Sequence, residues 1–185
     1  MDVKDAIDAR RAYRSLAPAE ITRELVEDLA ISAGLAPSCF NKQPWRFVFT
    51  YDEKTLKQLH EALPEGNAWV KYASMIITVF SKKEDDCIIE DRVYNMFDTG
   101  MACALLMLRA TELGLVAHPI AGYDPEKVRD VLGIPEEYQI ITLINAGKHS
   151  EKIPDYLSEY QAKTENVRPE RKTFDEYCSI GRFTP

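Results

Sequence analysis

The sequence contains no apolar run that approaches the roughly 20 residues a membrane-spanning helix needs. Its first residues, MDVKDAIDARR, carry too many charges to contain the apolar core of a signal peptide. Basic side chains are also in deficit, with 23 lysines and arginines against 30 acidic residues, and the formal net charge is -7. This balance argues against a nucleic-acid partner and against an anionic membrane surface. We therefore expect a cytoplasmic protein.

Cysteine and histidine are sparse, with four and three residues respectively in a chain of 185. The cysteines form no CxxC pair, and a chain of this length can bury a core without disulfides. We expect all four to be reduced packing residues: Cys39, Cys87, Cys103 and Cys178. The histidines are scattered without a partner at i+4, so we expect no metal site.

Three well-known phosphate and nucleophile motifs are absent: GxGxxG, GxxxxGK[ST] and GxSxG. Carboxylates are numerous, but stretches such as ELVED and EDDCIIED are typical of solvated helix faces. The sequence therefore offers no obvious catalytic side chain. Any chemistry is expected to come from a cofactor that carries its own reactivity.

Helical and strand patterns alternate along the chain, which predicts one domain. Helices are expected over residues 2–11, from about Thr22 to Gly34, near 53–63, from about Asp86 to Leu113, and between Asp124 and Gly133. Strands are expected at WRFVFTY, SMIITVF, 116–120 and 139–145, with SMIITVF at the centre of the sheet. The stretch MACALLMLRA is apolar almost all round, which predicts burial in the core or a subunit interface.

The segment beyond Gly147 is polar and charged and does not resemble an independent domain. It nevertheless carries five aromatic residues: Tyr156, Tyr160, Phe174, Tyr177 and Phe183. We therefore expect this tail to become ordered by lying on another surface.

Two basic clusters stand out against the acidic background. Arg10, Arg11 and Arg14 lie where a helix gives way to an extended segment, and guanidinium groups suit bidentate binding of phosphate. A basic helix end that offsets the helix dipole is the alternative. Arg168, Arg171 and Lys172 form the second cluster, for which an ordinary charged tail is the alternative.

Two further segments could hold a flat ligand. The loop LAPSCFNKQP offers amide and hydroxyl groups that can bond a heteroaromatic ring, although such residues also form turns. The segment HPIAGYD contains Gly122 beside Ala121, which allows a close approach of backbone N–H groups to a ligand. An ordinary connection between a strand and a helix is the alternative.

Taken in order, these segments resemble the nitroreductase family of flavoproteins. RRAYRSL resembles its phosphate-binding motif, APSCFNKQPWRF its flavin-ring loop, HPIAGYDPEKVRDVLGIP the segment that passes the flavin, and RPERKTFDEY the closing arginine motif. The resemblance implies an α+β fold, with a mixed central sheet flanked by helices and FMN at the interface of a homodimer. It also implies one domain over residues 1–185, in which 148–185 form a tail that embraces the partner subunit.

The resemblance implies a set of FMN-binding residues. The phosphate and ribityl chain would be held by Arg10, Arg11, Ala12, Arg14, Arg168 and Arg171. The ring would be contacted by Pro37, Ser38, Cys39 and Asn41 of the partner subunit, by Pro119, Ile120, Ala121 and Gly122, and by Asn67 at its pyrimidine edge. Ala12 and Ala121 depart from family members that carry Ser and Glu there, and both are expected to act through their backbone.

The implied reaction takes hydride from NAD(P)H and passes electrons to a nitroaromatic, a quinone or a similar acceptor by a ping-pong mechanism. An FMN-storage or redox-sensing protein with little turnover is one alternative. A specialised dehalogenase or flavin-fragmenting enzyme is another. Trp69 and the stretch 85–97, including Tyr94, would line the outer pocket, but nothing in them identifies the acceptor.

Overall fold

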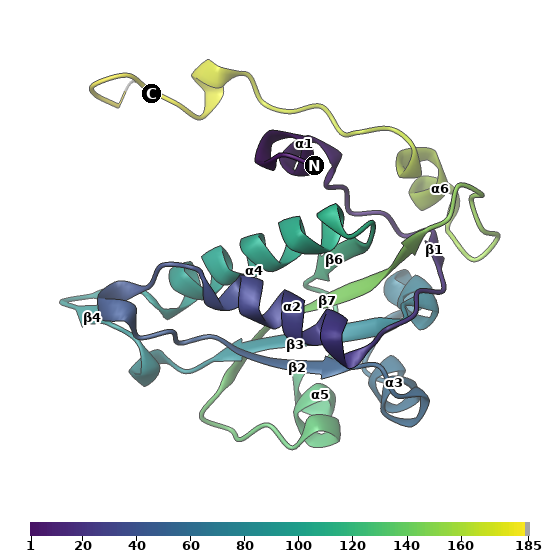
Figure 1. Ribbon diagram of the computed structural model, residues 1–185, viewed down its shortest axis with the longest axis horizontal. Helices are drawn as coiled ribbons and strands as arrows, with labels where there is room; N and C mark the ends of the chain where they lie inside the picture. The colour runs from purple at the N-terminus through teal and green to yellow at the C-terminus, as the bar shows by residue number, and fades with distance from the viewer. Residues whose placement is uncertain (184–185) are drawn as a thin grey trace.

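The computed structural model describes residues 1–183 and has an α+β fold built on one antiparallel sheet (Figure 1). Its strands are β1 (Leu16–Ala17), β2 (Arg46–Thr50), β3 (Met75–Ser81), β6 (Val116–Ile120) and β7 (Gln139–His149). β1, β7, β3 and β2 follow one another across the sheet, and β6 also pairs with β7. Every one of these strand pairs is antiparallel, whereas the resemblance had implied a mixed sheet.

Helices cover both faces of the sheet. α2 (Arg23–Gly34) and α4 (Asn95–Glu112) lie on one face, while α3 (Glu53–His60) and α5 (Pro125–Leu132) lie on the other (Figure 1). Alternate residues of β3 point to opposite sides, so Ile77 packs in the core beneath α2 and α4 while Ile76 packs in the opposite core. The continuous apolar run of β3 thus reflects burial on both faces, as predicted.

Shorter elements complete the chain. α1 (Val3–Ala9) packs on α4, and α6 (Glu159–Glu165) precedes the tail that crosses above α1 (Figure 1). Four 3-10 turns also occur within the described chain: η1 (Cys39–Asn41), η2 (Glu65–Tyr72), η3 (Lys83–Asp85) and η4 (Phe174–Glu176). Over residues 1–183 no helix combines the length and the apolar character that crossing a bilayer requires.

The prediction of a helix that begins at about Asp86 is wrong for its first nine residues. The chain instead forms a hairpin of β4 (Ile88–Ile89) and β5 (Arg92–Val93), and α4 begins only at Asn95. The β-branched isoleucines favour a strand, and Glu90 turns the chain with a φ of 60°. The hairpin is closed when the Tyr94 N–H donates to the Cys87 carbonyl oxygen at 3.2 Å.

The expectation that all four cysteines are reduced is wrong for two of them. Cys39 and Cys87 form a disulfide whose Cα atoms lie 6.0 Å apart, while Cys103 and Cys178 are free. The two cysteines are 48 residues apart in the sequence, so no local spacing pattern predicts that they pair. They meet because η1 and the hairpin fold against the same end of the molecule.

Candidate functional site

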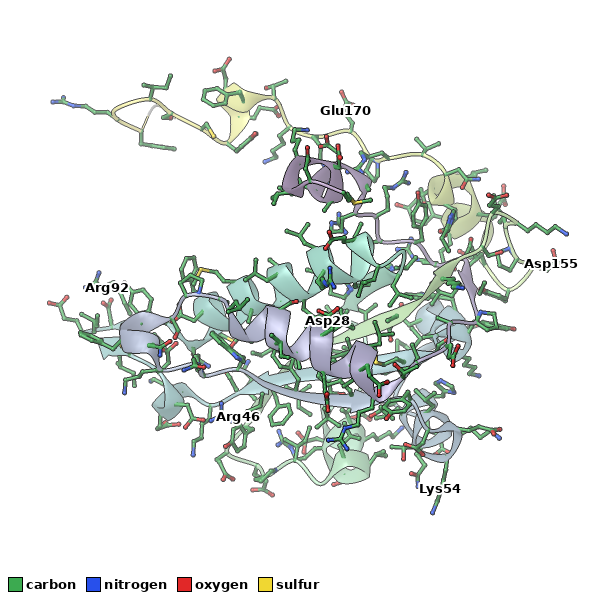
Figure 2. The ribbon with its side chains drawn as sticks, viewed as in Figure 1. Asp28, Arg46, Lys54, Arg92, Asp155 and Glu170 are labelled. Carbon is green, nitrogen blue, oxygen red and sulfur yellow. A yellow bond between two sulfur atoms is a disulfide. The ribbon has the colours of Figure 1, made fainter. Side chains whose placement is uncertain are left out.

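The two basic clusters of the sequence meet in space. Arg10, Arg11, Ala12 and Arg14 follow α1, and the tail returns beside them after α6. Together they enclose a cavity of about 220 Å³, lined by Arg10, Arg11, Ala12, Arg14, Tyr160, Thr164, Arg168, Pro169 and Arg171. Glu170, from the same part of the tail, is labelled above α1 in Figure 2. The structure thus joins residues separated by more than 150 positions.

A buried glutamate holds this junction in place. Glu165, at the end of α6, is 2% exposed, and its Oε1 accepts the backbone N–H groups of Arg14 at 2.8 Å and Ser15 at 2.6 Å. Its carbonyl oxygen accepts a bond from Nη2 of Arg11 at 3.0 Å, and Arg168 donates to the carbonyl oxygen of Asp8. The start of the tail is therefore part of the site.

The cavity concentrates positive charge, and the Glu165 carboxylate next to it is bonded to backbone N–H groups and not to a guanidinium group. Within residues 1–183, none of the ion pairs involves the five arginines that line it. Burial lowers the pKa of Arg10, and the neighbouring charges of Arg168, Arg171 and Arg11 lower it further. Such crowding is unfavourable unless an anion is bound, and five guanidinium groups suit the several oxygens of a phosphate.

The middle of β6 lies next to this cluster. Nδ1 of His118 is 3.0 Å from the carbonyl oxygen of Tyr13, which links β6 directly to the arginine segment. His118 is 7% exposed, and its burial is the main cause that lowers its pKa to about 4. A neutral imidazole therefore adds no further positive charge near Arg10 and Arg14.

Beyond β6, the backbone around Gly122 is open to a flat ligand. Pro119, Ala121 and Gly122 are exposed, whereas the side chain of Ile120 is buried in the core, so only the backbone of Ile120 can reach a ligand. Nδ2 of Asn67 donates to the Gly122 carbonyl oxygen at 2.7 Å. A Cβ atom at Gly122 would lie only 2.8 Å from that Nδ2.

Asn67 is thereby placed at this edge of the site. Its Oδ1 accepts a bond from Nε1 of Trp69 at 3.3 Å, so both ends of the amide have a partner. Trp69 is 1% exposed, and its ring lies 4.6 Å from that of His118, centroid to centroid, at an interplanar angle of 30°, so it belongs to the core. The proposal that Asn67 contacts a pyrimidine edge stays a prediction, whereas Trp69 is not exposed as a lining residue of an outer pocket.

The loop with Pro37, Ser38, Cys39 and Asn41 lies elsewhere. η1 is tied to the β4–β5 hairpin by the disulfide, at the opposite end of the molecule from α6 (Figure 1). Figure 2 shows the same separation, with Arg92 of the hairpin at one end and Asp155, just before α6, at the other. One chain therefore does not bring this loop to its own arginine cavity.

The loop has a defined conformation. The hydroxyl oxygen of Ser38 accepts the Gln43 N–H at 2.9 Å, and Oδ2 of Asp98 accepts the Cys39 N–H at 2.7 Å. Phe40 and Asn41 have φ angles of 49° and 56°, and the Phe40 side chain is 88% exposed. The loop thus presents an apolar ring and an exposed amide to its surroundings.

Several residues of the site carried no signal in the sequence. Glu165 was one carboxylate among many in a charged tail, and His118 was a single histidine in a strand. Tyr160 and Thr164 line the arginine cavity, although only the aromatic character of the tail pointed to its having a packing role. Their positions follow from the return of the tail to α1, which no local pattern reports.

Comparison with known proteins agrees with this geometry. The sequence profile of the nitroreductase family matches residues 7–148. A Thermus thermophilus protein called NADH dehydrogenase is 28% identical over 82% of this chain and 89% of its own length. An Archaeoglobus fulgidus protein described as an NADH dehydrogenase/NAD(P)H nitroreductase is 26% identical over 89% of this chain and 95% of its own. A crystal structure described as an oxidoreductase containing FMN superposes with a TM-score of 0.87 at 28% identity, covering 100% of this chain and 94% of that one. The chain therefore belongs to the nitroreductase family of oxidoreductases.

Proposed function

We propose that this protein is an FMN-dependent oxidoreductase that takes reducing equivalents from NAD(P)H and passes them to a nitroaromatic, a quinone or a similar acceptor. The observation that carries the proposal is the arginine cavity, whose arginines form no ion pair within residues 1–183. Strand β6, which leads to the exposed backbone at Gly122, is tied to the arginine segment through His118. Phosphate on the arginines and a flat ring along this backbone would suit the two ends of FMN.

The protein's own residues would bind and orient the cofactor. Arg10, Arg11, Arg14, Arg168 and Arg171 would hold the phosphate, with the backbone of Ala12 close by. The backbone of residues 119–122 would run beside the ring and supply N–H donors to it. When bound, FMN supplies the redox chemistry by accepting hydride from NAD(P)H and returning electrons to the acceptor. No catalytic side chain is then required.

The ring loop would come from a second copy of the chain. The loop that contains η1 is tied to the β4–β5 hairpin, and β4 lies at the opposite end of the molecule from α6 and its arginine cavity (Figure 1). A dimer in which η1 of each subunit reaches the other's cavity would complete two equivalent sites, as two-fold symmetry requires. The isolated chain would then contain both halves of the site without assembling them.

The first turn of α4 offers an apolar surface for such a dimer. Met96 and Phe97 are 43% and 64% exposed, whereas Leu105 and Leu108 further along the helix lie beside α1 of the same chain. This end of α4 would meet the partner while the rest of the helix packs in its own subunit.

The tail packs on its own subunit as far as α6, but the aromatic side chains that follow among the described residues are open to solvent. The side chains of Phe174, Tyr177 and Phe183 are 54%, 68% and 86% exposed. We propose that residues 148–185 extend onto the partner of a cytoplasmic homodimer, and that residues 1–185 form a single FMN-binding domain. Burial of these rings would then supply the free energy that orders the tail.

Anaerobic reduction tests the catalytic proposal. The purified protein, loaded with FMN, is mixed with NADH or NADPH, and the oxidised flavin absorption is followed before acceptors are added one at a time. Bleaching by either nucleotide and rapid recovery with a nitroaromatic or quinone are expected. If FMN binds but is not reduced, or is reduced but gives its electrons to no acceptor at a useful rate, the protein is a flavin-storing or redox-sensing protein instead.

A further inference from the structure

A second cluster of reactive groups lies outside the arginine cavity. It consists of the Cys39–Cys87 disulfide and two acidic residues, Asp86 and Asp98. Cys39 begins η1, Cys87 leads into the β4–β5 hairpin, and Asp98 lies in the first turn of α4. Three separate elements therefore meet at one disulfide.

The two sulfur atoms differ in their access to solvent. Cys87 is 7% exposed, whereas Cys39 is only partly buried. In the flavin-free protein a thiol from solution can therefore approach Cys39 more easily than Cys87. In thiol–disulfide exchange the sulfur that is not attacked becomes the leaving group, so the departing electron pair would form on the buried Cys87 sulfur.

The backbone N–H groups of both cysteines donate hydrogen bonds to buried carboxyl groups. Oδ1 of Asp86 accepts the Cys87 N–H at 2.7 Å, and Oδ2 of Asp98 accepts the Cys39 N–H at 2.7 Å. Asp86 and Asp98 are 5% and 2% exposed. Within residues 1–183, Oδ2 of Asp86 is buried without a hydrogen-bond partner. An unpaired buried carboxylate oxygen is costly, but a protonated one can donate a bond.

The surroundings of Asp86 favour its protonated form. Burial raises the pKa of its carboxyl group, and the charge of the nearby Asp98 raises it further. The Cys87 N–H and the charge of Lys42 act in the opposite direction. A carboxylic acid held next to the Cys87 backbone is a suitable proton donor for a thiolate formed there.

We propose that Cys39 and Cys87 form a reversible dithiol–disulfide site, opened by an external dithiol at Cys39, with Asp86 as the acid that protonates the Cys87 sulfur. The reagent's thiolate attacks Sγ of Cys39, the S–S bond breaks, and its electron pair leaves on Sγ of Cys87, which takes the proton of Asp86. The second thiol of the reagent then attacks the mixed disulfide and releases the thiol of Cys39. The reagent is oxidised to its disulfide, two cysteine thiols are formed, and Asp86 regains a proton from solvent.

The bond joins the ring loop to the hairpin. Its opening leaves the loop held by the bond from the Cys39 N–H to Asp98 and by the bond from the Gln43 N–H to Ser38. Reduction would therefore loosen residues 38–43 and 87–94 without unfolding the sheet. Any effect of this loosening on FMN rests on the proposed function, whereas the thiol chemistry itself requires no flavin.

Thiol counting tests the site directly in the flavin-free protein. A Cys103→Ala, Cys178→Ser variant retains only the proposed pair. It is equilibrated with oxidised or reduced dithiothreitol, treated with an alkylating maleimide while folded, and weighed by mass spectrometry. No adduct in the oxidised sample, two in the reduced sample and full return on reoxidation are expected. Two adducts after oxidation, or a bond that opens only in denaturant, would overturn the proposal.

Kinetics test the role of Asp86. In the same background, Asp86→Asn keeps the shape of the side chain but removes the acid, and Asp91→Asn removes a carboxylate from the exposed turn of the hairpin as a control. Loss of the acid should slow reduction by dithiothreitol on the order of 100-fold, whereas the control should leave it unchanged. Equal rates in the two variants would remove Asp86 from the reaction.

The role of Asp86 can also be tested without substituting it, in case the Asp86→Asn variant does not fold. The reduction rate of the unsubstituted pair is divided by the concentration of reagent thiolate and followed as the pH rises. Because only protonated Asp86 can act, this corrected rate should fall as the pH passes the raised pKa of Asp86. A corrected rate independent of pH would contradict the assignment. Neither measurement involves FMN, so a failure here is distinct from a failure of the proposed oxidoreductase activity.

Discussion

The phosphate clamp can be tested by removing two of its arginines. Arg10 and Arg171 lie on different segments, both line the cavity, and the charge of Arg171 contributes to lowering the pKa of Arg10. A hydrogen bond to a charged group is worth about 1.5 to 3 kcal/mol, so the double Arg10→Ala, Arg171→Ala change forfeits up to about 6 kcal/mol. Relief of repulsion in the empty cavity offsets part of this. We expect a net loss of about 1.4 to 4 kcal/mol, or about 10- to 1000-fold in FMN affinity.

The assay compares two ligands that differ only in the phosphate. Calorimetric titration of the flavin-free protein should show a large loss for FMN and a small loss for riboflavin. The matched control is the double Arg23→Ala, Arg92→Ala variant, which removes the same charge from two exposed arginines outside the cavity. Its FMN affinity should stay close to that of the unsubstituted protein. Equal losses for FMN and riboflavin in the clamp variant would show that these arginines serve the fold and not phosphate.

Three further outcomes are expected. First, double-reciprocal plots at several acceptor concentrations should be parallel, because donor and acceptor would use one site in turn; intersecting lines would indicate a ternary complex. Second, Glu165→Ala should lower the free energy of unfolding by about 2 to 4 kcal/mol, since it leaves the N–H groups of Arg14 and Ser15 without their acceptor; chemical denaturation measures this, and a change below about 0.5 kcal/mol would refute it. Third, His118 has a pKa of about 4 in the folded protein and an ordinary value near 6.5 when unfolded, so the unfolded state binds more protons between these values. The stabilisation from a neutral His118 should therefore be present above about pH 6.5, and the free energy of unfolding should fall by about 2 kcal/mol between pH 7 and pH 5. The His118→Gln variant should lose most of this pH dependence when its unfolding is measured by urea titration.

Sequence periodicity predicted the elements whose patterns are local. β3 was identified by a continuous apolar run, and α5 by its cap at Asp124 and its stop at Gly133, which adopts the left-handed conformation with φ 64°. Both features depend only on neighbouring residues. The predicted helix from Asp86 failed because charged residues around Ile88 and Ile89 imitate a helical period, while the hairpin depends on a turn at Glu90.

The site was predictable as a set of segments and not as a geometry. Arginines at residues 10–14 and 168–171 were visible as basic clusters, but their meeting depends on Glu165, which bonds the backbone of Arg14 across 151 residues. The Cys39–Cys87 bond was missed for the same reason. Contacts of this length follow from the path of the whole chain, so side-chain type alone does not report them.

The central claim is that each FMN site is built from two chains, and mixed dimers test it most directly. One subunit carries Arg10→Ala and Arg171→Ala, and the other carries Ser38→Ala and Asn41→Ala. The two are co-expressed with different affinity tags, and the heterodimer is purified through both tags. One of its sites collects all four changes, whereas the other receives intact arginines from one chain and an intact loop from its partner.

The measurement is the amount of FMN bound per heterodimer and the NAD(P)H-dependent activity that accompanies it. If the site spans two chains, both parent homodimers bind FMN poorly, and the heterodimer recovers roughly half the FMN and half the activity of the unsubstituted dimer, by counting sites under two-fold symmetry. If the heterodimer forms but binds no more FMN than the average of its parents, the site lies within one chain, and the assignment of the loop from Pro37 to Asn41 to the partner is wrong.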